Sequence, residues 1–211
     1  MDLFNLREEF LKKTLDEKDI HKNPVNQFEA WFLEALNASV KEPNAMTLST
    51  SWADGRISSR VVLLKQVTQE GLVFFTNYNS NKAMQLMQNP YCAVNFMWHE
   101  LERQVRIEGL AEYVSPQDSD LYFEHRPVNS KLGAWASPQS GVIPNRQYLV
   151  DLMEKYGKRY KNKHIERPPN WGGYIVKPSL FEFWQGRENR LHDRIRYKRE
   201  KNKWIIERLA P

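Results

Sequence analysis

The spacing of apolar residues changes several times along the chain and predicts where helices give way to strands. In residues 3–13 and 25–40, apolar side chains recur three and four positions apart, which predicts two amphipathic helices. In the second of these, Phe28 and Trp31 share one face, and Pro24 stands where helices commonly begin. After this helix the apolar period becomes two, which is typical of strands with one buried face.

The strand-like segments outnumber the helical ones. Asp54-Gly55 between the first two is a good hairpin signal. Ser80 and Ser115 stand as candidate N-caps before two of the later helices. The pattern predicts strands over 46–52, 57–67, 72–77, 91–98, 103–114, 171–178, 180–186, 190–199 and 203–211, helices over 80–89, 116–126 and 147–160, and a short segment at 131–137.

Six or more antiparallel strands with helices at the periphery indicate an α+β fold with a barrel-like sheet rather than alternating βαβ units. We expect one domain over residues 1–211. Its parts would be an N-terminal helical segment (1–42), a first barrel half (43–114), a helical excursion (115–170) and C-terminal barrel strands (171–211).

Composition narrows the class of protein. Hydrophobic residues make up 41% and aromatic residues 12% of the chain, which predicts a packed core rather than a disordered chain. A single cysteine, Cys92, excludes an internal disulfide and a multi-cysteine zinc site, as is usual in a reducing compartment. Charges occur in every turn of the first residues, and no apolar run approaches membrane-spanning length. These features predict a cytoplasmic protein without a membrane partner.

The net charge of +5 raises the question of nucleic-acid binding. Basic and acidic residues are mostly interspersed, and a long Lys/Arg block is absent, so this signal is weak. A few arginines directed at a small phosphorylated ligand would give the same balance.

The stretch "WQGRENRLHDRIRYKRE" is dense in cations near the C-terminal end. If it is a strand, Arg190, His192 and Arg194 point to one face, and Leu191 and Ile195 to the other. Two interpretations stay open on these residues alone. The first is a solvated edge strand whose charges discourage edge pairing. The second is an anion site, because arginine offers a planar fork of donors suited to phosphate or carboxylate.

Other cations stand near a predicted helix start. Arg60 and Lys65 lie at the two ends of the apolar run "RVVLLK", on opposite faces if the strand is regular. Thr76 and Lys82 flank the start of the helix at 80–89, where backbone N–H groups favour an anion. The chain has no glycine-rich dinucleotide loop and no P-loop, so any nucleotide cofactor needs another phosphate cradle of this kind.

Several chemistries find no support in the sequence. No two of the five histidines have the spacing of a helical metal motif, so we expect no metal centre. No GxSxG elbow is present, and nothing basic flanks Cys92. Cations, aromatic rings and hydrogen-bond donors remain, which suit a reaction performed by a bound cofactor.

The order of motifs resembles the FMN-dependent pyridoxamine (pyridoxine) 5′-phosphate oxidase family. Its marks extend over nearly the whole chain as "RVVLLK", "FFTNYNSNKA", "WHELERQVRIEG", "YFEHRPVNSKLGAWASPQS", "WGGY", "FWQGRENRLHDR" and "RLAP". The resemblance implies a split β-barrel and a homodimer whose interface holds two FMN sites.

The resemblance also implies roles for individual residues. FMN would contact Arg60, Val61, Leu64, Lys65, Phe75, Thr76, Lys82, Gln104, Gln139, Ser140, Trp184 and Arg194. The substrate phosphate would lie near Lys65, Tyr122, Arg126 and Ser130, and the catalytic pair Arg190 and His192 would meet the substrate ring, with Arg7 as a further candidate above it. Each phosphate carries roughly −1.5 to −2 charge near neutral pH, so two phosphorylated ligands need several fixed cations.

The implied reaction oxidises the 4′ carbon of pyridoxamine or pyridoxine 5′-phosphate to give pyridoxal 5′-phosphate. A hydride passes to flavin N5, O₂ reoxidises the flavin to yield H₂O₂, and the amine substrate releases ammonia. The protein would need to supply placement and charge stabilisation rather than a nucleophile.

Two positions depart from the family pattern. Asn81 stands where the family commonly has arginine, which predicts weaker FMN binding, and Phe10 stands where a tyrosine is frequent beside Arg7. Two rival functions remain. One is a flavin-binding split-barrel protein that has lost this reaction and acts as a general flavin reductase or a binding module. The joint presence of five residues argues against it: Tyr122, Arg126, Ser130, Arg190 and His192. The other is a basic nucleic-acid-binding domain that stacks bases on exposed aromatic rings.

Overall fold

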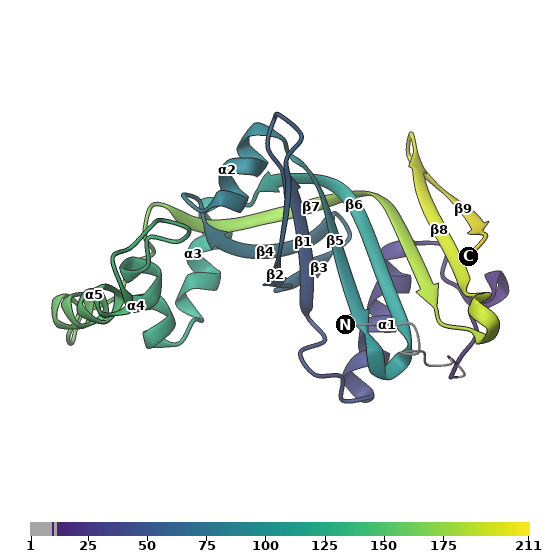
Figure 1. Ribbon diagram of the computed structural model, residues 1–211, viewed down its shortest axis with the longest axis horizontal. Helices are drawn as coiled ribbons and strands as arrows, with labels where there is room; N and C mark the ends of the chain where they lie inside the picture. The colour runs from purple at the N-terminus through teal and green to yellow at the C-terminus, as the bar shows by residue number, and fades with distance from the viewer. Residues whose placement is uncertain (1–9, 11) are drawn as a thin grey trace, which may run out of the picture.

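The computed structural model describes residue 10 and residues 12–211, which form one curled antiparallel sheet with a group of helices at one end and further helices beside it (Figure 1). The strands are β1 (Ala45–Ser51), β2 (Ile57–Leu63), β3 (Gln66–Thr68), β4 (Gly71–Asn77), β5 (Tyr91–Trp98), β6 (Arg103–Tyr113), β7 (Trp171–Gln185), β8 (Asp193–Glu200) and β9 (Lys203–Leu209). The helices are α1 (Pro24–Asn37), α2 (Asn81–Gln88), α3 (Pro116–Glu124), α4 (Val128–Ala136) and α5 (Arg146–Arg159), with 3₁₀ turns η1 (Glu17–Asp19), η2 (His99–Leu101) and η3 (Glu188–Arg190).

The long strand β7 organises the sheet. It pairs with β6 along one side, and on its other side its first half pairs with β4 and its second half with β8. A register shift at Glu108/Gly109 accommodates Pro178, which has no N–H for the ladder. A Cβ on Gly109 would lie 2.1 Å from the Lys177 carbonyl oxygen, so this close approach requires glycine. The sheet can therefore bend midway along β7 and separate its two ends.

Two apolar clusters lie along the sheet. Helix α1 begins at Asn23, whose side chain accepts from the Val25 N–H, and it buries Phe28 and Trp31 against the sheet. The Phe28 ring lies 5.0 Å from that of Phe96. A second, smaller cluster contains Phe123, Leu132, Ile165 and Trp171, where α3 and α4 pack near the start of β7.

The helices expected after residue 20 and the predominance of antiparallel strands are confirmed, with three differences in the strands. The expected strand 57–67 divides after Leu63, because Leu64 packs into the core. The expected strands 171–178 and 180–186 are one strand, β7. Most of the expected helix 3–13 lies outside the described residues, and Lys12 and Lys13 are not helical.

The third difference concerns the cationic C-terminal stretch. Strand β8 begins at Asp193, so the prediction of one strand face bearing Arg190, His192 and Arg194 is wrong. Asn189 and Arg190 have left-handed backbone angles, φ 55° and 61°, and the Leu191 N–H bonds back to the Glu188 carbonyl. Residues 186–192 therefore form a turn rather than a strand.

Candidate active site in two groups of residues

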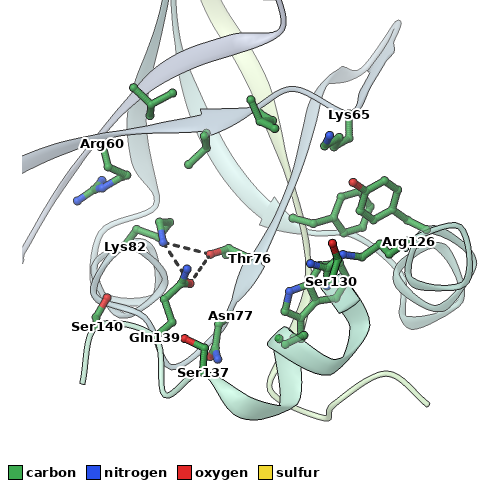
Figure 2. A pocket seen from close by; sticks show the side chains of 18 of the residues that line it. Arg60, Lys65, Thr76, Asn77, Lys82, Arg126, Ser130, Ser137, Gln139 and Ser140 are labelled. Atoms are coloured by element: carbon green, nitrogen blue, oxygen red, sulfur yellow. Dashed lines mark hydrogen bonds between the residues drawn. The ribbon is translucent and has the colours of Figure 1, made fainter. Parts of the chain in front are cut away.

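A cavity of about 1000 Å³ lies where β2 and β4 approach the starts of α2 and α4 (Figure 2). Four cationic side chains line it: Arg60, Lys65, Lys82 and Arg126. None of its described lining residues is an aspartate or glutamate, and none of the four cations has an ion pair with a described carboxylate. Arg60, Lys82 and Arg126 are partly or largely buried, and Lys65 is exposed. Buried cations without carboxylate partners indicate that the cavity binds anions.

Lys82 lies at the start of α2, nine-tenths buried. Its Nζ is 3.2 Å from Thr76 Oγ1 and 3.4 Å from Gln139 Oε1, and Thr76 donates to the same Gln139 oxygen at 3.2 Å. Burial, and secondarily the charge of Arg60, lowers the pKa of Lys82 to about 8. Its ammonium therefore gains a neutralising partner only when an anion enters.

The first turn of α2, which carries Lys82, has no hydrogen bond from its N-cap side chain. Ser80 occupies the N-cap position, but its hydroxyl donates to the Asn77 carbonyl at 2.7 Å and makes no capping bond. The Asn81 N–H instead donates to Ser140 Oγ at 3.2 Å. The backbone here adds partial positive charge to the cavity wall.

Arg60 is fixed by uncharged partners. Its guanidinium donates to the Leu48 carbonyl and to the hydroxyls of Thr50 and Ser58, at 3.2, 2.5 and 2.6 Å, and to Gln85 at 3.2 Å. Burial lowers its pKa, and these contacts hold the charge in place without neutralising it.

Arg126 lies beside a stack of aromatic rings. Phe75 and Tyr122 stack with centroids 3.9 Å apart, and the Arg126 guanidinium lies 4.6 Å from the Trp171 ring. Its Nη1 is buried and has no hydrogen-bond partner among the described residues. Ser130 and Lys65 line the same part of the cavity (Figure 2). An unsatisfied buried donor is costly, so this corner is suited to a phosphate oxygen.

The cavity brings together most of the residues expected to bind ligands. These are Arg60, Val61, Lys65, Phe75, Thr76, Lys82, Tyr122, Arg126, Ser130, Gln139 and Ser140. Leu64 does not line the cavity, because its side chain packs in the core. Arg60 and Lys65 were expected on opposite faces if one regular strand carried both. The strand β2 ends at Leu63, so this condition is not met, and both side chains line one cavity.

A second group of expected site residues lies elsewhere on the sheet. Gln104, Trp184 and Arg194 are directly paired in register across β6, β7 and β8. The His192 ring is 4.6 Å from the Trp184 ring, and Arg190 is exposed on the neighbouring turn. None of these five residues lines the cavity.

The two groups lie at opposite ends of β7. Trp171, at its first residue, lines the cavity, whereas Trp184 comes thirteen residues later. A strand rises about 3.3 Å per residue, so the separation along β7 is up to roughly 40 Å. In Figure 1 helices α3 to α5 lie at one end of the molecule, and β8 and β9 at the other. Arg7, the remaining candidate, is outside the described residues.

Comparison with known proteins identifies the family. A family model described as pyridoxamine 5′-phosphate oxidase matches residues 32–168, and a model described as pyridoxine 5′-phosphate oxidase C-terminal dimerisation region matches residues 171–211. The chain belongs to the pyridoxamine 5′-phosphate oxidase family. Relatives from Mannheimia succiniciproducens and Neisseria meningitidis serogroup B, both named pyridoxine/pyridoxamine 5′-phosphate oxidase, are 52% and 53% identical over 211 residues, 100% of both chains in each pair.

Solved structures confirm the split-barrel fold expected from the resemblance. PhzG from Burkholderia lata 383, solved in complex with tetrahydrophenazine-1-carboxylic acid, has a TM-score of 0.90 at 30% identity, covering 95% of this chain and 99% of that one. A pyridoxamine 5′-phosphate oxidase-related, FMN binding protein from Nostoc punctiforme has a TM-score of 0.70 at 20% identity, covering 87% and 97%. The second shows the fold alone.

Some cavity residues were not anticipated from the sequence. Trp171 supports Arg126, and Asn77, His125 and Ser137 also line the cavity. A tryptophan at the start of a strand predicts burial, and linear spacing does not show which arginine lies over its ring. Among the described residues no group of three or more His, Cys, Asp or Glu side chains could hold a metal ion. No helix in the described part of the chain has both the length and the apolar character to cross a membrane.

Proposed function

We propose that this member of the family oxidises pyridoxamine 5′-phosphate or pyridoxine 5′-phosphate to pyridoxal 5′-phosphate in the cytoplasm, with FMN as cofactor and O₂ as oxidant. The observation that carries the proposal is the cavity whose four cations have no carboxylate partner among the described residues. A phosphorylated substrate and a phosphorylated cofactor together bring about −3 to −4 charge, which four cations and a helix start can balance.

The residues around α2 fit the phosphate of FMN. Lys82 and Arg60 supply charge, and Thr76, Gln139 and Ser140 supply hydrogen-bonding groups. The buried position and lowered pKa of Lys82 support the assignment, because an anion beside it would stabilise its charged form. We assign Val61 and Phe75 to the flavin as apolar contacts. FMN, when bound, supplies the two-electron acceptor and the reactivity with O₂.

The residues around Arg126 fit the substrate phosphate. Its unpartnered Nη1, the Lys65 ammonium and the Ser130 hydroxyl offer donors, and Tyr122 closes the wall beside them. A phosphate held here anchors one end of the substrate, so that its reacting carbon is oriented by binding energy from a group that does not react.

We infer that the active site is completed by a second copy of the chain. Arg190, His192, Trp184, Arg194 and Gln104 cannot reach the cavity of their own chain, because up to roughly 40 Å of strand separates the two groups. In a twofold dimer each chain would contribute the cavity to one site and the His192 group to the other. The family model for residues 171–211, a dimerisation region, supports this arrangement.

The oxidation reaction is tested by anaerobic titration of the FMN-loaded protein with pyridoxamine 5′-phosphate. We expect the flavin absorbance to bleach, to recover on admission of air, and pyridoxal 5′-phosphate to appear. A flavin that binds and stays oxidised would instead support a flavoprotein that lacks this activity. A protein that takes up no flavin and binds nucleic acid with steep salt dependence would support the third interpretation.

The composite site is tested by mixing two inactive variants, Arg126→Met and His192→Asn, under conditions that exchange subunits. Half of the dimers are then mixed, and each mixed dimer has one intact and one doubly altered site, so activity should return to about one quarter of the wild-type value. If both groups served a site within one chain, mixing would restore no activity.

A further inference from the structure

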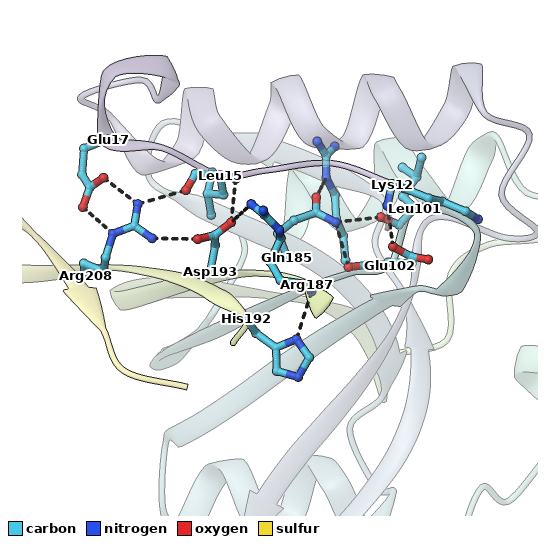
Figure 3. Close-up of polar contacts among 11 residues, drawn as sticks. Lys12, Leu15, Glu17, Leu101, Glu102, Gln185, Arg187, His192, Asp193 and Arg208 are labelled. Atoms are coloured by element: carbon cyan, nitrogen blue, oxygen red, sulfur yellow. Dashed lines mark hydrogen bonds and ion pairs between the residues drawn. The ribbon is translucent and has the colours of Figure 1, made fainter. Parts of the chain in front are cut away.

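The turn that carries Arg190 and His192 is stabilised by a hydrogen bond to the histidine ring. The backbone N–H of Arg187 donates to His192 Nδ1 at 3.1 Å, across five residues. A backbone N–H can only donate, so Nδ1 must be the acceptor nitrogen of a neutral imidazole, and the ring proton lies on Nε2. Nε2 has no hydrogen-bond partner among the described residues and points away from the polar contacts drawn in Figure 3.

The groups around His192 favour its neutral form. Phe10 and Trp184 contact the ring edge-on and tilted, with centroids 5.6 and 4.6 Å away. Burial and the charge of Arg190 lower the pKa of His192, whereas the carboxylate of Asp193 raises it. The first two effects exceed the third, so His192 is uncharged near neutral pH and can offer Nε2–H as a donor.

Asp193, the next residue, connects this turn to two other parts of the chain. Its Oδ2 accepts from Arg187 Nη1 at 2.9 Å and from the Leu15 N–H at 3.1 Å, and its Oδ1 accepts from Arg208 Nη1 at 2.9 Å (Figure 3). Arg208 also forms a two-bond ion pair with Glu17 at 2.7 and 2.6 Å. One carboxylate therefore joins the turn, strand β9 and the segment before η1.

The turn needs such an anchor because its backbone is strained. Asn189 and Arg190 are consecutive non-glycine residues with left-handed angles, which persist only when surrounding contacts impose them. Arg187 is the only described residue that bonds both to His192, through its N–H, and to Asp193, through its side chain. The two contacts of Arg187 therefore connect the carboxylate of Asp193 to the Nδ1 atom of His192.

We propose that Asp193 is a positioning residue: by holding Arg187, it keeps His192 in the Nε2–H form with that proton directed at the substrate ring. The expected effect on the reaction rate rests on the proposed oxidase function. The expected tautomer of His192 does not depend on that function. The Asp193 carboxylate bonds to Arg187, Leu15 and Arg208 of its own chain. Its contribution passes through Arg187, whereas Arg208 and Leu15 hold the carboxylate in place.

The direct test is ¹⁵N NMR of the imidazoles in the FMN-loaded full chain at pH 8. The His192 signals are assigned by their loss in His192→Asn. We expect a single Nε2–H tautomer in the wild type and, in Asp193→Asn, signals averaged between the two tautomers. Asp54→Asn, which removes the carboxylate of an aspartate–arginine pair in the β1–β2 turn, serves as the matched control and should leave the His192 signals unchanged.

The kinetic test compares kcat/KM for pyridoxamine 5′-phosphate. Misplacing a group that orients the substrate costs about 10- to 100-fold, so we expect a loss of that size in Asp193→Asn, mainly in kcat, at unchanged FMN content. Asp54→Asn should stay within about twofold. If the wild type had no turnover, the proposed function would fail, and the NMR result would still decide whether Asp193 sets the tautomer.

A second variant covers the case in which Asp193→Asn does not fold. Arg187→Met removes the side-chain link to Asp193 but keeps the Asp193–Arg208 pair and the Arg187 N–H. It should reproduce the tautomer mixture and the loss in kcat, and the double variant should be no worse than either single one, because both break the same connection. A single Nε2–H tautomer in Arg187→Met, or losses that add in the double variant, would overturn the proposal.

Discussion

The two ends of β7 differ in how their cationic side chains are balanced. At the cavity end, Arg60, Lys65, Lys82 and Arg126 have no ion pair with a described carboxylate. At the β8 end, four arginines have carboxylate partners: Arg187 with Asp193, Arg194 with Glu182, Arg196 with Glu207, and Arg208 with Glu17 and Asp193. These pairs stabilise the turn and strands, and they include Arg194, which is expected to contact FMN. The four cavity cations, by contrast, are available to an anionic ligand.

Two arginines at the β8 end have no ion pair among the described residues. Arg199 lies over the Trp204 ring, 5.8 Å from its centroid. Arg190 is exposed and lies next to a neutral histidine. Its place beside His192, rather than the missing ion pair alone, agrees with the role proposed for it opposite the substrate ring.

The largest expected effect is the loss of activity on replacing an unpaired arginine at the cavity end of β7. Arg126→Met should lower kcat/KM for pyridoxine 5′-phosphate about 100-fold, because charge-assisted hydrogen bonds contribute about 1.5–3 kcal/mol and each 1.4 kcal/mol is tenfold. Turnover of unphosphorylated pyridoxamine should change much less. Steady-state kinetics with both substrates measures this.

The matched control is Arg196→Met, which removes a paired arginine from β8. We expect kcat/KM within about threefold of the wild type, since half-exposed ion pairs contribute little. Equal losses for phosphorylated and unphosphorylated substrates in Arg126→Met would contradict the assignment of Arg126 to the phosphate.

A smaller effect concerns pH. Lys82, whose pKa is lowered to about 8, is charged below pH 8 and neutral above it, and an anion binds the charged form. Binding therefore takes up a proton above pH 8, and the FMN affinity should fall by up to roughly tenfold per pH unit between pH 8 and 9.5. Fluorescence titration of the apoprotein measures it.

Two variants of Lys82 sharpen this prediction. Lys82→Arg keeps its charge throughout this range and should flatten the profile, and Lys82→Met should bind FMN weakly at every pH. A wild-type profile as flat as that of Lys82→Arg would show that Lys82 does not bind the phosphate.

The smallest effect concerns the departure at Asn81, which is exposed at the mouth of the cavity. Asn81→Arg adds a cation beside the helix start and should lower the FMN dissociation constant about threefold, as expected for an exposed charge. Asn79→Arg adds the same charge in the same loop outside the cavity lining and should have less effect. An unchanged or higher dissociation constant in Asn81→Arg would contradict the prediction that Asn81 weakens FMN binding.

The sequence by itself determined the elements and the family. Apolar periods placed α1, α2, α3, α5 and most strands, because a helix or strand that buries one face must repeat with its own period. The ordered motifs, from "RVVLLK" to "RLAP", identified the family and the residue types around the cavity. These properties are local, or depend only on the order of residues.

The tertiary structure alone decided how the cations are used. Alternation could not show that β8 starts at Asp193, because Asn189 and Arg190 adopt left-handed backbone angles and Asp193 is held by residues distant in the chain, Leu15 and Arg208. Nor could it show that Arg126 is unpaired while Arg208 is paired, since ion pairs join positions far apart in the chain. A charged side chain stabilises the fold when such a distant partner neutralises it, and it can bind a ligand when no partner does. The spacing of residues in the sequence does not reveal these partners.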